Sequence, residues 1–188
     1  MKHIFFSICL MLSISLLFAQ NKYHATKTNI KMEGTSTMHD WHMISEEGIS
    51  DVTFNFDGPN LSGMPALTFS VQAETLKSGT KALNKNAYKS LNTEKYPAIA
   101  FASNFATIHS TGVNSYLISV KGKLTISGVS KDVWVSVTCK VNPDQSIQAT
   151  GSCKLKMSEY NVSPPSFMFG AMKTGDEVSI KFNALLVK

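Results

Sequence analysis

At 188 residues, the chain is long enough for one domain with a substantial buried core. All 18 of its basic residues are Lys, spread along the sequence without a cluster, and Arg, the side chain best suited to gripping phosphate, does not occur. The composition therefore argues against nucleic-acid binding, which needs a concentrated basic surface.

The first residues have the pattern of a secretory signal. Lys2 and His3 precede an apolar run over residues 4–18, which ends at Ala19, a small residue suited to cleavage. A membrane anchor is the alternative, but the run is shorter than the roughly 20 residues that span a bilayer. We therefore expect a signal peptide over residues 1–19, one domain over residues 20–188 and export to the periplasm or the medium. No later stretch predicts stable membrane insertion.

Alternation of apolar and polar residues predicts strands in the first part of this domain. They cover residues 28–35, 49–56 and 66–76. A period of two puts alternate residues on one face of a sheet, so Phe69 and Val71 of the third strand point inward. Residues 21–27 lack this alternation and are interpreted as a polar lead-in.

One segment departs from the β pattern. Apolar residues recur there near helical spacing, at Ala82, Leu83, Ala87, Tyr88 and Leu91. This predicts one short helix around residues 80–91, lying across an end or the outside of the sheet. A strand over residues 98–108 follows, with Ile99, Phe101 and Phe105 expected on one face and small alanines on the other.

Residues 117–156 predict three consecutive strands that share one apolar face. In the first, inward positions include Ile118, and in the second they include Val135 and Val137. The sequence Asn142-Pro143-Asp144-Gln145 is a strong turn signal before the third strand.

Cys139 and Cys153 lie in the second and third of these strands. If the turn centres near Asp144, Cys139 faces Ala149 or Gly151 across the strand pair and not Cys153. Two interpretations stay open: a disulfide permitted by a bulge that shifts the register, or two small apolar residues facing inward.

An apolar loop and a last strand complete the chain. Residues 166–172 contain two Phe and two Met after a Pro-Pro break, and such a loop must bury these side chains somewhere. It forms either a mouth or lid, or a permanent plug at one end of the fold. The final strand covers residues 178–186.

Together these segments predict an all-β fold, an extended antiparallel barrel of about eight strands with one helix, and a sandwich is the alternative. The interior of such a barrel holds either its own side chains or one small ligand. The candidate lining residues are Phe69, Val71, Phe101, Phe105, Tyr116, Ile118, Val135, Val137, Phe167, Phe169, Met172 and Phe182.

Four motifs occur in a fixed order along the chain. They are Gly34-Thr35-Ser36-Thr37-Met38-His39-Asp40-Trp41, Lys95-Tyr96-Pro97-Ala98-Ile99-Ala100-Phe101, Gly122-Lys123-Leu124-Thr125-Ile126-Ser127-Gly128-Val129-Ser130-Lys131 and Lys173-Thr174-Gly175-Asp176-Glu177-Val178. In these motifs the sequence resembles the YceI-like family of exported lipid-binding proteins.

The resemblance implies a lipocalin-like barrel that holds a long apolar chain, such as a polyisoprenoid or a fatty acyl derivative, in its lumen. Many members carry an Arg-Asp-x-His segment before the Lys-Tyr-Pro motif. This chain instead has Asn84-Lys85-Asn86-Ala87-Tyr88-Lys89. We expect Lys85, Tyr88 or Lys173 to lie near a mouth, where each is a candidate contact for a polar head group or merely exposed.

Catalysis and metal binding are not predicted, and no cofactor is expected. In a strand His39 and His42 would point to opposite faces, and no third metal ligand lies nearby. No nucleophile elbow or paired-carboxylate pattern occurs. The leading hypothesis is an exported protein that binds a lipid or isoprenoid. The alternative is a structural or adaptor barrel with a filled core, which could dimerise through an exposed Trp41 or Trp134.

Overall fold

A computed structural model describes residues 20–167 and 172–188 of the chain. Its strands are β1 (Gln20–Ser36), β2 (Trp41–Ser45), β3 (Ile49–Asp57), β4 (Asn60–Gln72), β5 (Ala98–Gly112), β6 (Ser115–Ile126), β7 (Val129–Val141), β8 (Ile147–Lys156), β9 (Ser166–Phe167) and β10 (Met172–Val187). The helical elements are α1 (Lys81–Leu91) and two short 3-10 helices, η1 (Ala73–Thr75) and η2 (Met157–Tyr160).

The strands form one antiparallel sheet that closes on itself. Its order is β2-β1-β3-β4-β5-β6-β7-β8-β10-β9, and β1 also pairs with β10. Eight long strands therefore make the wall, with β2 and β9 as short additions. On the outer side of the closing β1–β10 pair, hydrogen bonds from Lys181 and Lys31 lower the pKa of the Glu33 carboxyl to about 2. The predicted all-β, lipocalin-like barrel of about eight strands is confirmed.

Strand β1 is longer than its sequence pattern indicates. Its first residues, 20–24, pair with β3, while residues 30–34 pair with β2. The interpretation of residues 21–27 as a polar lead-in is therefore wrong, and Tyr23 within them is buried. A register shift between Ala25 and Lys27 interrupts the alternation of side chains, so the sequence there shows no period of two.

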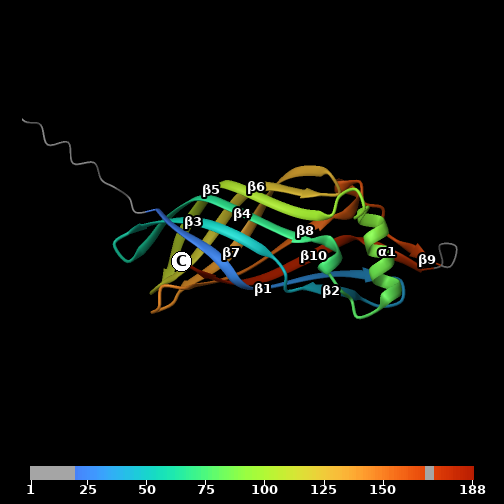
Figure 1. Cartoon of the computed structure of the whole chain (residues 1–188), viewed down its shortest axis with the longest axis horizontal. Coiled ribbons are helices and arrows are strands. Elements are labelled where there is room, and N and C mark those ends of the chain that lie inside the picture. The colour runs from blue at the N-terminus through green and yellow to red at the C-terminus, as the bar shows by residue number, and fades with distance from the viewer. Residues whose placement is uncertain (1–19, 168–171) are drawn as a thin grey trace, which may run out of the picture.

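The helix occurs where helical spacing predicted it, and it lies across one end of the barrel (Figure 1). The side-chain oxygen of Asn84 accepts hydrogen bonds from the Ser78 backbone N–H at 2.8 Å and the Ser78 hydroxyl at 2.7 Å. Near its other end, the Tyr88 hydroxyl lies 2.9 Å from the Glu74 carbonyl oxygen and 2.8 Å from that of Leu76. These bonds fasten α1 to the segment that follows β4.

The end of the barrel opposite α1 is filled by aromatic side chains. Tyr23 and Phe54 pack edge to face, with ring centroids 5.5 Å apart, and Phe56 lies 6.4 Å from Tyr23. The hydroxyl of Tyr116 accepts a hydrogen bond from the Leu61 N–H at 3.2 Å and so joins β6 to the β3–β4 hairpin. The interior is therefore closed at this end.

Strands β6, β7 and β8 are neighbours and share one inward apolar face, as predicted. In the β7–β8 register Cys139 lies opposite Ala149, and Cys153 lies opposite Ile180 of β10. Both cysteines are free, so of the two interpretations the pair of small inward residues holds.

Two glycines on the inward side of the wall accommodate aromatic rings from neighbouring strands. A Cβ atom at Gly122 would overlap the ring of Phe101, and one at Gly151 would overlap the ring of Phe182. The tips of both rings therefore take the space that a side chain would occupy. This arrangement keeps two large residues against the wall and away from the barrel axis.

We predict that Gly151→Ala lowers the free energy of unfolding by about 1–3 kcal/mol, because the added methyl group displaces the Phe182 ring. Urea unfolding followed by Trp fluorescence measures the change. Gly112→Ala is the matched control, since a Cβ there meets nothing within 4 Å. Equal stability of the two variants would contradict the tight fit at Gly151.

We also predict that neither cysteine reacts readily with a thiol reagent in the folded protein at pH 8. Burial raises the pKa of Cys139 to about 12 and also raises that of Cys153, so both thiols stay protonated and unreactive. Titration with Ellman's reagent should find both thiols only after denaturation. Finding none in denaturant without a reductant would indicate a disulfide and contradict the structure.

Candidate ligand-binding site

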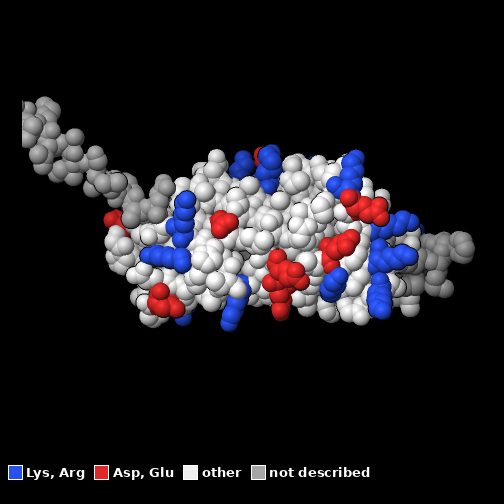
Figure 2. Space-filling view, viewed as in Figure 1, with Lys and Arg blue, Asp and Glu red and all other residues white. Residues whose placement is uncertain are grey.

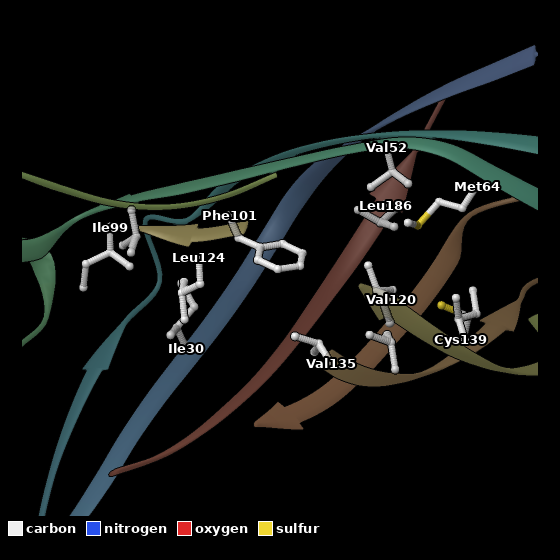
Figure 3. Close-up of a cluster of buried hydrophobic side chains, with 14 of the residues drawn as sticks. Ile30, Val52, Met64, Ile99, Phe101, Val120, Leu124, Val135, Cys139 and Leu186 are labelled. Carbon is white, nitrogen blue, oxygen red and sulfur yellow. The ribbon is translucent and has the colours of Figure 1, made fainter. Parts of the chain in front are cut away.

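The barrel encloses a cavity of about 160 Å³ on its axis. Side chains from all parts of the wall converge on it, among them Ile30 from β1, Val120 from β6 and Leu186 from β10 (Figure 3). For comparison, a dry engineered cavity of about 150 Å³ lined by aliphatic and aromatic residues binds benzene. An apolar cavity of this size is better suited to an apolar ligand than to water.

The few polar side chains at this cavity already have partners in the protein. The Thr28 hydroxyl donates to the Glu46 carbonyl at 2.9 Å and accepts from the Gly48 N–H at 3.0 Å. The Ser50 hydroxyl donates to the Thr68 carbonyl at 3.1 Å. Asn183, which also borders the cavity, is an exposed residue. The cavity therefore offers mainly apolar surface.

A second, smaller cavity of about 70 Å³ lies under α1. Helix residues such as Leu83 and Ala87 line it, together with Tyr160 of η2. It shares four lining residues with the first cavity: Met32, Leu76, Ile99 and Ile180. Along β8, Cys153 faces the first cavity and Leu155 the second. The two cavities therefore follow one another along the barrel and form one interrupted lumen.

Seven of the predicted lining residues do line the larger cavity: Phe69, Val71, Phe101, Ile118, Val135, Val137 and Phe182. They come from the parts of β4, β5, β6, β7 and β10 where the alternation is regular and fixes the inward face.

Two predicted residues do not reach the cavity. Phe105 is 51% exposed and packs edge to face against Trp134 on the outer surface, with ring centroids 6.2 Å apart. A register shift between Ala102 and Phe105 reverses the faces in this part of β5, which the sequence did not reveal. Tyr116 is buried, but it belongs to the filled end and not to the cavity lining.

The three remaining residues belong to the predicted apolar loop. Phe169 lies outside the described residues, as does most of the segment expected to form a mouth or plug. The backbone of Phe167 pairs with that of Met172 in the β9–β10 ladder, while their side chains lie outside the description.

Sequence reasoning missed most residues of the smaller cavity. Trp41, Met157, Tyr160 and Val162 line it, and they lie in or beside the short elements β2 and η2. Such short elements carry no measurable periodicity, so only their apolar character could have suggested burial.

The sequence motifs meet around this end of the barrel. Thr37 and Lys173 exchange hydrogen bonds: the Thr37 N–H donates to the Lys173 carbonyl at 3.0 Å, and the Lys173 N–H donates to the Thr37 hydroxyl at 3.2 Å. Asp176 accepts from the Ser158 N–H at 2.8 Å and the Ser158 hydroxyl at 2.6 Å, which lowers the pKa of its carboxyl. The bonds between Ser158 and Asp176 fix η2, and with it Tyr160, against the barrel.

The residues considered for head-group or metal binding are exposed to solvent or already hydrogen-bonded within the protein. Lys85 and Lys173 are exposed, and Tyr88 is engaged in fastening α1. His39 and His42 are exposed, and the described residues hold no cluster of three or more His, Cys, Asp or Glu side chains that could bind a metal.

Figure 2 shows Lys and acidic side chains spread over the visible face, with several Lys near the end that carries α1. No helix among the described residues is long and apolar enough to cross a membrane.

Comparison with solved structures gives the same fold. The crystal structure of Burkholderia cenocepacia BcnA matches with a TM-score of 0.68 at 23% identity, over 86% of this chain and 96% of that chain. A polyisoprenoid binding domain from Saccharophagus degradans matches with a TM-score of 0.65 at 10% identity, over 87% and 97%. A Campylobacter jejuni YCEI protein matches with a TM-score of 0.56 at 16% identity, over 74% and 81%.

Comparison with curated proteins gives no match. The sequence pattern of the YceI-like domain, however, matches residues 20–186. This span contains all four motifs and every strand that lines the lumen. The resemblance seen in the motifs is therefore confirmed, and the chain belongs to the YceI-like family.

Proposed function

We propose that this protein is an exported binding protein that holds the long apolar chain of an amphiphile, of polyisoprenoid or fatty acyl type, in its lumen. The binding would serve carriage, storage or stress protection. The observation that carries the proposal is the apolar cavity on the barrel axis, whose few buried polar groups are satisfied within the protein.

Apolar burial supplies enough free energy for such binding. Each buried CH₂ group contributes about 0.8 kcal/mol, so about ten methylenes contribute roughly 8 kcal/mol before the cost of association. The second cavity extends the space toward α1, and a chain that crosses both would bury more of its length. Affinity then depends on chain length and shape.

The fold comparison supports the same class of ligand. The Saccharophagus degradans neighbour is described as a polyisoprenoid binding domain, and it shares this fold over most of both chains. We extend that ligand class to this protein as a proposal, because an acyl chain and an isoprenoid chain both need an elongated apolar space.

The lining residues favour binding over catalysis and over a purely structural role. Among the described residues, neither cavity is lined by a His, a carboxylate or a Lys, the side chains that most often act as general acids or bases. Burial keeps the Cys139 and Cys153 thiols protonated, which makes them poor nucleophiles. A purely structural barrel would fill its core with its own side chains and leave no cavity on the axis.

We also propose that the protein is exported. The basic and apolar pattern of residues 1–19 is that of a signal peptide, and the domain match begins at residue 20. Mass determination of the mature protein from an exporting bacterium would test cleavage after Ala19.

We predict that Val137→Phe weakens binding of the fluorescent probe N-phenyl-1-naphthylamine by about tenfold, a loss of about 1.4 kcal/mol, because the added ring fills the cavity. Thr138→Phe, one residue away on the exposed face of β7, is the matched control and should bind like the wild type. Urea unfolding of both variants checks that the fold persists.

The same pair of variants tests the natural ligand. Organic extraction of freshly purified protein, followed by mass spectrometry, should give a stoichiometric amphiphile from the wild type and Thr138→Phe, and little from Val137→Phe. Equal recovery from all three proteins, or none from any, would contradict binding in the lumen.

A further inference from the structure

The hydroxyl of Tyr160 is a buried polar group without a partner. Tyr160 is only 1% exposed, and its hydroxyl oxygen has no hydrogen-bond partner among the described residues. Buried hydroxyl groups in proteins are nearly always hydrogen-bonded, because leaving one unpaired costs free energy. Contacts within the described part of the protein therefore do not explain how the buried Tyr160 hydroxyl is satisfied.

The position of Tyr160 relates this hydroxyl to the lumen. Tyr160 lines the smaller cavity under α1. Burial is the main reason that its pKa is raised to about 12, and the nearby Cys153 raises it further. Cys153 itself lines the larger cavity. At neutral pH the group remains protonated and able to donate.

The other buried oxygen without a partner provides a contrast. Asn55 Oδ1 is also unsatisfied among the described residues, but Asn55 lines neither cavity and lies at an irregularity in the β3–β4 ladder. Tyr160 alone of these two combines an unused hydrogen-bonding group with a place on the lumen.

The surroundings of Tyr160 restrict the chemistry of a partner. None of the described residues that line the smaller cavity carries a charge. The indole N–H of Trp41 donates to the Thr35 carbonyl at 3.2 Å and is therefore in use. A carboxylate or phosphate buried here would lack a counter-ion, which is a costly arrangement. A neutral oxygen acceptor would instead satisfy the hydroxyl.

The ends of the lumen fix the orientation of the bound molecule. Tyr23, Phe54 and Tyr116 close the far end, so only an apolar chain end fits toward it. A polar group on the same molecule then lies at the α1 end, where Tyr160 is held by η2 and by the hydrogen bonds between Ser158 and Asp176. Tyr160 is thus held in place at the end of the lumen where a head group would lie.

We propose that the Tyr160 hydroxyl donates a hydrogen bond to the polar group of the bound amphiphile, and that the lumen prefers a long chain with a neutral acceptor oxygen, such as a ketone or ester, over one with a carboxylate or phosphate. This inference rests on the proposed function, since it concerns the head group of a ligand whose chain occupies the lumen.

The test compares Tyr160→Phe with the wild type for three probes of similar length. They are heptadecan-2-one, heptadecane and hexadecanoate, each displacing N-phenyl-1-naphthylamine at pH 7. Affinity for the ketone should fall about three- to tenfold in Tyr160→Phe, as expected for one lost hydrogen bond, while affinity for heptadecane stays unchanged. The wild type should bind hexadecanoate at least tenfold more weakly than the ketone.

Tyr96→Phe is the matched control, because it removes the hydroxyl of another Tyr, half-buried, that lies outside both cavities. It should bind all three probes like the wild type. The infrared carbonyl stretch of bound heptadecan-2-one gives a direct reading: it should be lower in frequency in the wild type than in Tyr160→Phe, which a merely structural role would not produce.

The outcomes separate this inference from the proposed function. If the ketone and heptadecane both bind but Tyr160→Phe changes neither the ketone affinity nor its carbonyl stretch, lumen binding stands and the role of Tyr160 is wrong. Binding of hexadecanoate as tight as that of the ketone would overturn the preference for a neutral head. If no probe binds the wild type, the proposed function itself fails.

Discussion

The ladder between β1 and β10 is the constraint on which the rest of the structure depends. It joins the first and last long strands of the domain, from the His24–Val187 pair to the Ser36–Thr174 pair. The sheet therefore has one continuous inner face. Once the sheet is closed, every inward side chain faces others across the axis. Because no strand edge is free to shift, the wall cannot move inward to close the space that these side chains leave. The size of the residues along that face then decides whether the interior is solid or hollow.

That face is hollow in the middle and solid at one end because of where large residues are placed. The rings of Phe101 and Phe182 lie over glycines in the wall, which leaves the axis free. At the far end Tyr23 and Tyr116 fill the interior. At the other end α1 and η2 cover the lumen, and Asp176 of the last YceI-like motif accepts the hydrogen bonds that hold η2 there. The result is a tube filled by aromatic side chains at one end and covered by helical elements at the other.

Alternation along single strands predicted the part of the site that long regular strands make. Val135 and Val137 were identifiable because β7 keeps its period of two from Val133 to Val141. The prediction failed where the ladder is irregular: the bulge before Phe105 turned that ring outward, and the shift at Ala25 hid the start of β1. Tyr160 could not be found at all, because a four-residue 3-10 helix carries no periodic signal and its burial depends on contacts from distant segments.

A crystal structure of the protein grown with heptadecan-2-one would show whether the barrel axis accommodates an apolar chain. We expect continuous tubular electron density from the neighbourhood of Met64 to the smaller cavity beside Tyr160, with the wall side chains in their present positions. Density for the ketone only on the outer surface, with the lumen closed by repacked side chains, would contradict it.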